Sequence, residues 1–167
     1  MNIFKTKHNY NLYIRLLELS RNIFFYKNIN LKDSFETRIY LMFFHFSILL
    51  LVYKKKGEKF DQINYDNFFH SIENDLRELG FGDVYVNKKM KDLNKILYDI
   101  LLKLEKSEDS TKLIMLNTKL IKKYFNELNG QNDLNLKKLE KYFLFFFNFC
   151  FEIPIKTMLK EIKNFKY

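Results

Sequence analysis

The stretch IYLMFFHFSILLLVY, residues 39–53, decides the fold because it is apolar on almost every side. It has 15 residues, among them His45 and Ser47, and is shorter than the roughly 20 apolar residues that a helix needs to cross a bilayer. A helix that is apolar all round is typical of a protein interior. We therefore predict that this stretch forms a buried central helix, surrounded by the other helices of the chain.

Signals for the two ends of this helix flank the stretch. Asp33 is followed three positions later by Glu36, an arrangement similar to a capping box, which predicts Asp33 as the N-cap. Gly57 follows three lysines on the other side, and glycine is the residue that most often terminates a helix. The central helix is thus expected to begin just after Asp33 and to end before Gly57.

The rest of the chain also favours helix over sheet. Apolar residues recur at three- and four-residue spacing, and the 167 residues include only 4 Gly and 1 Pro. We predict an all-α fold of about six helices in one domain, residues 1–167. The expected helices besides the central one are 9–27, 64–79, 88–106, 111–128 and 136–151, with an amphipathic tail after Pro154. The expected helix 136–151 contains YFLFFFNFCF. This stretch indicates a part of the core or, alternatively, a surface for a hydrophobic partner or membrane.

The net charge of +9 raises the question of nucleic acid or anionic membrane as a partner. Lysine accounts for 25 of the 29 basic residues, and Asn is abundant while Ala and Trp are absent, which indicates a coding bias. The excess is uneven: residues 111–167 have 11 basic and 5 acidic residues, against 18 and 15 in residues 1–110. We predict weak, salt-sensitive association of the C-terminal third with an anionic membrane or the ribosome. Lys119, Lys122 and Lys123 are expected to be solvated.

Catalytic and metal-binding patterns are not found in the sequence. The single Cys150 cannot form an internal disulfide, which favours a reducing compartment. His45 is expected to be a neutral core histidine hydrogen-bonded to a neighbouring helix, with a haem or metal ligand as the alternative. His70 is expected to pair with Asp66 at the surface. We predict no cofactor, and the N-terminus lacks the pattern of a secretory signal.

The stretch NDLRELGFGDVYVNKKMKDL, residues 74–93, contains two of the 4 glycines. Gly80 is expected to end one helix, with Phe81 folding back on its last turn, and VYV to form an extended link before an N-cap at Asn87. A helical wheel places Leu79 toward the core. It places Asn67, His70, Asn74 and Arg77 in solvent. A plain turn between helices would explain the glycines, but the charged residues around them favour a partner-binding edge. The candidate site is His70, Arg77, Glu78, Gly80, Gly82, Asp83, Lys88 and Lys89.

Residues 68–93, FFHSIENDLRELGFGDVYVNKKMKDL, resemble the signature of the ubiquinol-cytochrome c chaperone family, whose members assist assembly of cytochrome b into the bc1 complex. The matching positions are Leu76, Arg77, Glu78, Gly80, Gly82, Asp83, Val86, Lys88 and Lys89. Upstream, SRNIFFY and SFETRIYLMFFHF are similar to two further sequence blocks of the family. His45 falls at the position of a His in the second block. The resemblance is strongest over residues 15–98. Asn87 replaces a usual Pro, and Asp99 and Ile100 replace a usual Gly-Arg.

The resemblance implies an all-helical, non-catalytic assembly chaperone that binds newly made cytochrome b. It also implies a small helical partner protein and, in mitochondria, action near the ribosomal exit. It implies no DNA binding. The expected location is the cytoplasm, peripheral to the inner membrane, or the mitochondrial matrix in a eukaryote. The alternative is a basic helical module that binds RNA or protein and has no role in respiratory assembly.

Overall fold

The computed structural model describes residues 10–105, 116–130 and 133–167, and all regular elements in these ranges are helical. The all-α prediction is confirmed for this part of the chain. Its α-helices are α1 (Tyr10–Ser20), α2 (Phe35–Lys55), α3 (Gln62–Glu78), α4 (Asp83–Glu105), α5 (Thr118–Tyr124), α6 (Asp133–Glu152) and α7 (Ile155–Glu161). Shorter turns are the π-helix η2 (Phe24–Asn28) and the 3₁₀-helices η3 (Asn126–Leu128) and η4 (Ile162–Asn164). The α-helix beyond the expected six forms in the tail after Pro154.

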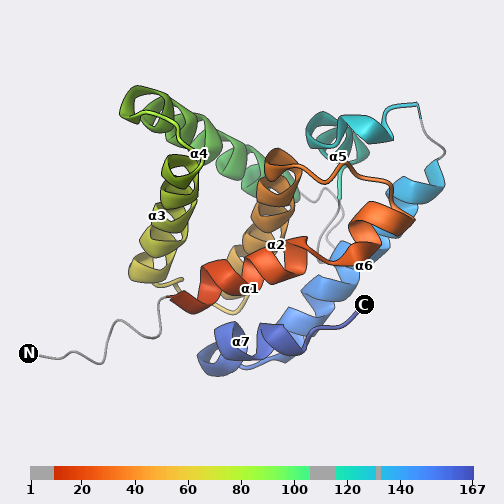
Figure 1. Ribbon diagram of the computed structural model, residues 1–167. Coiled ribbons are helices and arrows are strands. Elements are labelled where there is room, and N and C mark those ends of the chain that lie inside the picture. Colours follow the sequence, from red (N-terminus) through yellow and green to blue (C-terminus); the bar gives the residue numbers. More distant parts are fainter. Residues whose placement is uncertain (1–9, 106–115, 131–132) are drawn as a thin grey trace, which may run out of the picture.

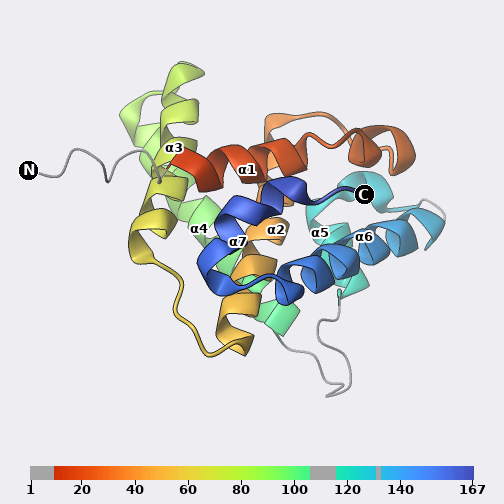
Figure 2. The ribbon, with the colours of Figure 1, turned by 90° about the horizontal axis from the view of Figure 1, so that it is seen from below.

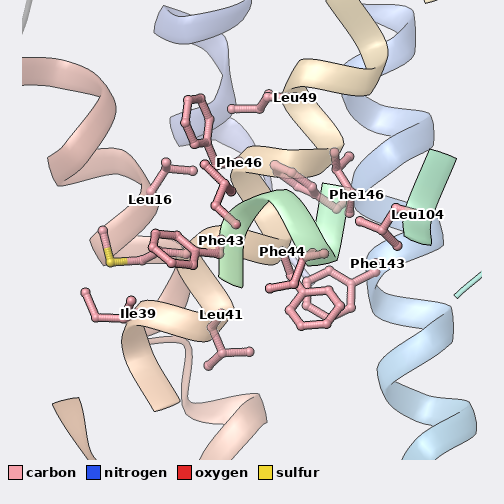
Figure 3. Packing of buried hydrophobic residues seen from close by; sticks show 14 of the residues in the cluster. Leu16, Ile39, Leu41, Phe43, Phe44, Phe46, Leu49, Leu104, Phe143 and Phe146 are labelled. Atoms are coloured by element: carbon pink, nitrogen blue, oxygen red, sulfur yellow. The ribbon is translucent and has the colours of Figure 1, made fainter. Parts of the chain in front are cut away.

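The α2 helix lies in the middle of the molecule, with α1, α4 and α6 packed around it (Figure 1). Every residue from 41 to 49 is buried. Figure 3 shows its side chains pointing to opposite sides, with Phe43 toward Leu16 of α1 and Phe44 against Phe143 of α6. The rings of Phe44 and Phe143 are stacked, with centroids 5.3 Å apart. The prediction of a buried central helix is confirmed.

Among the described residues, α2 is the one helix that is long and apolar enough to cross a membrane by length and composition. The core helix of a soluble protein meets the same criterion. In this fold 72% of its most apolar window is buried against the other helices. Because protein rather than solvent surrounds most of this window, α2 acts as the core of the bundle.

The two ends of α2 test the predicted stop and start signals. The N-cap is Ser34 rather than Asp33, since the Ser34 hydroxyl accepts a hydrogen bond from the backbone N–H of Thr37 at 3.2 Å. Asp33 instead accepts a hydrogen bond from the guanidinium of Arg38 at 2.8 Å, which removes its carboxylate from the cap. At the other end Gly57 adopts φ of 73°, and the helix ends before it as predicted.

The prediction of one continuous helix over residues 9–27 is wrong. The α1 helix ends at Ser20, and η2 begins only at Phe24. Polar side chains compete with the helical backbone at this point. The Ser20 hydroxyl donates to the Leu17 carbonyl at 2.7 Å, and the Asn22 side chain accepts from the Phe24 N–H at 3.0 Å. The Tyr26 hydroxyl donates to the Ser20 carbonyl at 2.6 Å, which occupies an acceptor that a longer helix would need.

The C-terminal helices differ from prediction mainly in their bounds. Residues 111–115, the start of the expected helix 111–128, lie outside the described residues. The α5 helix begins after Asn117, whose side chain accepts from the Lys119 N–H at 2.9 Å, and η3 completes the segment up to Leu128. The α6 helix begins at Asp133, three residues before the predicted start, and Pro154 separates it from α7 as expected.

One continuous core joins residues from Leu12 in α1 to Phe165 near the C-terminus. Most apolar residues of α6 belong to this core, but Leu144 and Phe145 are among those that are exposed. The α6 helix therefore presents both a core face and an apolar surface face. The assignment of residues 1–167 to one domain stays a prediction.

Candidate functional site

The α3–α4 corner contains most of the predicted site residues. Gly80 ends α3 with φ of 91°, a left-handed conformation that favours glycine. Its N–H donates to the Arg77 carbonyl at 2.9 Å, and the Phe81 N–H donates to the Leu76 carbonyl at 3.3 Å. This pair of bonds is the Schellman motif, so the predicted role of Gly80 is confirmed. The backbone of Phe81 folds back on the last turn of α3, while its ring stacks on Tyr85 of α4.

The prediction of an extended VYV link with an N-cap at Asn87 is wrong, because α4 already begins at Asp83. The Gly82 carbonyl accepts the first helical hydrogen bond, from the Val86 N–H at 3.0 Å. Asp83 in the first turn is favoured by the positive end of the helix dipole. The early start also turns Val86 into the core, where it is fully buried.

Apolar side chains are exposed at this corner. Val84 is 86% exposed, and Phe81 and Tyr85 stack on each other at the surface with ring centroids 4.4 Å apart. Leu79 was predicted to face the core but is exposed, because it is the C-cap residue that follows the last turn of α3. We call Leu79, Phe81, Val84 and Tyr85 the apolar corner.

Charged residues form a line beside the apolar corner. Arg77 donates to Glu73 at 2.8 Å and to Asp83, and these hydrogen bonds raise the pKa of the Arg77 guanidinium. His70 lies 3.9 Å from the Glu73 carboxylate rather than beside Asp66, so its predicted partner is wrong. Glu73 was missed by the sequence analysis, although its spacing of three from His70 and four from Arg77 is that of helical neighbours.

The other predicted site residues point in different directions. Glu78 lines a groove between α1, α2 and α3. Lys89 bonds the Glu36 carboxylate at 2.9 Å and so connects α4 to the start of α2. Lys88 and Gly82 are exposed at the corner itself. The structure thus places Gly80, Gly82, Asp83 and Lys88 at one corner and assigns Glu78 and Lys89 to its two flanks.

The groove has a volume of 420 Å³ and continues from the apolar corner through Leu79. Ile39 and Met42 of α2 are buried beneath it. Its lining is Tyr13, Leu17, Arg21, Phe35, Arg38, Ile39, Met42, Asp75, Glu78 and Leu79. Burial, together with a hydrogen bond to Asp75, raises the pKa of the Tyr13 hydroxyl, so this group remains a donor. The groove therefore combines an apolar floor with basic and acidic side chains.

His45 is fully buried in the core, as predicted. Its Nδ1 donates to the Leu41 carbonyl at 2.6 Å, and its Nε2 accepts from the Tyr142 hydroxyl of α6 at 2.8 Å. Burial lowers the pKa of His45 to about 4 and raises that of the buried Cys150 thiol. Both imidazole nitrogens are occupied, and no cluster of three or more metal-ligating side chains exists among the described residues.

Asp99 and Ile100, two positions in α4 where the sequence departs from the resemblance, have different environments. Ile100 is fully buried and belongs to the core. Burial acts to raise the pKa of Asp99, but hydrogen bonds from Lys103, Lys123 and Tyr124 lower it overall. Lys123, at 2.8 Å from Asp99, is therefore paired across α4 and α5 rather than simply solvated as predicted.

These features define a helical protein whose exposed apolar corner and charged groove are typical of protein binding. The model of the Ubiquinol-cytochrome C chaperone family matches residues 27–165, which is most of the chain. The chain therefore belongs to this family. The match includes α5, α6 and α7, where the resemblance was faint, and it begins after SRNIFFY. No curated protein and no solved structure matches the chain.

Proposed function

We propose that the protein is a non-catalytic assembly chaperone that binds newly made cytochrome b and supports biogenesis of the bc1 complex. Family membership supports a chaperone role in bc1 assembly. The observation that carries the finer proposal is the continuity of the apolar corner with the groove through Leu79. An apolar client segment can lie on the corner while polar groups at its side reach the groove.

The chemistry of this surface favours a protein client over a nucleic acid. Its charges have both signs, because two basic and two acidic residues line the groove: Arg21, Arg38, Asp75 and Glu78. A phosphate backbone would be repelled by the carboxylates, whereas a protein segment can offer matching charges of both signs. DNA is therefore not among the proposed partners.

Further partners and the location are part of the same proposal. A small helical partner protein is a second candidate for the groove, because an amphipathic helix places its apolar stripe in such grooves. We also propose action on the side of the membrane where cytochrome b is made, the bacterial cytoplasm or the mitochondrial matrix. Association with the ribosome or an anionic membrane is the third element of the proposal.

The test uses Val84→Asp, with Ile63→Asp as its matched control. Val84 and Ile63 are the second residues of α4 and α3, and they are 86% and 56% exposed. Aspartate near a helix N-terminus is favoured by the helix dipole, so both variants should fold. Recovery of cytochrome b with the tagged protein should fall about tenfold or more for Val84→Asp, since a charge disrupts an apolar contact. Ile63→Asp should recover a normal amount.

Deleting the gene and measuring assembled bc1 complex tests the biological role. The proposal expects loss of assembled complex, restored by the Ile63→Asp form and not by Val84→Asp. Equal recovery of cytochrome b by both variants would show that the apolar corner does not bind the client. Normal bc1 assembly in the deletion would remove the chaperone role.

A further inference from the structure

A second exposed apolar surface lies at the other end of the molecule. Ile23 beside η2 is 60% exposed and Phe145 of α6 is 51% exposed. Tyr167 joins them, with its ring centroid 4.9 Å from Phe24 and 5.8 Å from Phe145. We call the exposed side chains of this surface the C-terminal face: Ile23, Leu134, Leu144, Phe145 and Tyr167.

Figures 1 and 2 place η2, α6 and the C-terminus side by side, away from the α3–α4 corner. Leu134 lies on the same side of α6 as Phe145, since eleven residues complete about three helical turns. The C-terminal face therefore extends along α6 from its first turns to the chain end.

The charges around this face are mostly of one sign. Five exposed lysines lie within or next to its segments: Lys27, Lys137, Lys141, Lys163 and Lys166. None of the five has an ion-pair partner within the described part of the chain. The exposed carboxylates of α6 are Asp133 and Glu152, near its two ends, while Glu140 is half-buried. Glu18 of α1 is exposed beside Lys163. A partner for this face must therefore accept apolar side chains and supply negative charge.

We propose that the C-terminal face binds the anionic surface of a lipid bilayer. Leu, Ile, Phe and Tyr side chains enter the boundary between headgroups and acyl chains, and lysines extend to lipid phosphates. RNA fits less well, because aliphatic Leu134, Leu144 and Ile23 offer no ring on which a base can stack. This proposal rests on the membrane association in the proposed function, which it assigns to one face and to a bilayer. It is independent of client binding, since the apolar corner remains free when this face lies on a membrane.

The first experiment measures co-sedimentation of the full chain with vesicles of phosphatidylcholine, with and without phosphatidylglycerol. Lys137→Glu combined with Lys141→Glu should lower binding to the anionic vesicles by about tenfold or more. The control, Lys91→Glu combined with Lys95→Glu, makes the same change of net charge on exposed positions of α4. The control should keep most of the binding. Thermal unfolding of each variant verifies that it folds.

The second experiment locates the contact with a fluorescent reporter. The chain has no Trp, so Phe145→Trp introduces a single one on the C-terminal face. Its emission should shift to the blue with anionic vesicles, and brominated lipids should quench it. Phe81→Trp, at a position 41% exposed on the apolar corner, is the matched reporter and should not change.

Three results overturn the proposal. Equal loss of vesicle binding in both double variants would show that binding depends on the net charge of the protein and not on this face. An unchanged emission of Phe145→Trp in the presence of anionic vesicles would exclude insertion of this face. Binding to ribosomal RNA that depends on Lys137 and Lys141, without binding to vesicles, would assign the face to the ribosome.

Discussion

The apolar corner and the C-terminal face expose the same kinds of side chain but differ in the charges around them. The corner has Arg77 and Asp83 beside it and acidic as well as basic groups in the adjoining groove. The C-terminal face has mainly lysines without ion-pair partners in the described residues. Exposed apolar area alone indicates that something binds, while the surrounding charge indicates what kind of partner fits. The comparison favours a protein client at the corner and an anionic bilayer at the face.

Both surfaces depend on the same core, and removing part of it should have the largest effect. Phe143 is fully buried between α2 and α6, stacked on Phe44. Phe143→Ala should lower the free energy of unfolding by about 3–5 kcal/mol, because it leaves a cavity in a packed interior. Urea unfolding measures the loss. Client capture and vesicle binding should decline together, and a loss confined to one activity would mean that the two surfaces do not share a core.

Acid should weaken the core at the contact between α2 and α6, behind the C-terminal face. Burial lowers the pKa of His45 from 6.5 to about 4 in the folded protein, so the unfolded chain binds more protons in this interval. Stability should therefore fall by about 3 kcal/mol as the pH decreases from 6.5 to 4 on account of this residue. The free energy of unfolding of His45→Leu, measured against pH, should lack this component. Parallel curves for the two proteins would contradict the buried neutral histidine.

The two glycines of the corner should differ in their tolerance of a side chain. Gly80→Ala should cost about 1–2 kcal/mol, because φ of 91° is strained for alanine. Gly82 has open space at its Cβ position and no left-handed φ, so Gly82→Ala should change stability by less than about 0.5 kcal/mol. At a temperature where the Gly80→Ala variant is folded, its binding to vesicles should stay normal, because Gly80 lies away from the C-terminal face. Equal costs for the two substitutions would show that the corner does not require the left-handed conformation.

The sequence predicted the elements whose signals are local. The burial of α2 follows from its composition, and the end of α3 follows from Gly80. The start of α4 was mistaken, because nothing in VYV distinguishes an extended link from a first helical turn until Val86 is seen in the core. The same holds for the N-cap of α2, where Asp33 and Ser34 both fit and the contact with Arg38 decides between them.

The candidate site was predicted only in part, for a related reason. Charge and glycine marked the α3–α4 corner, but Leu79 was predicted to face the core, and Val84 was placed in an extended link without a prediction of its exposure. A helical wheel assigns apolar residues to the interior, whereas their exposure depends on which neighbouring helix covers them. The exposed apolar residues of α6, Leu134, Leu144 and Phe145, were not singled out for the same reason, since a helix with apolar residues on every side gives no sign of its uncovered face.

The most direct test of the client-binding role is site-specific photo-crosslinking during synthesis of cytochrome b. A photoreactive amino acid is placed at Val84 on the apolar corner, at Ile63 as the matched exposed position on α3, or at Phe145 on the C-terminal face. The account predicts a crosslink to newly made cytochrome b from position 84 and none from 63 or 145, with the product identified by mass spectrometry. Crosslinks to cytochrome b from 145 but not from 84 would contradict it.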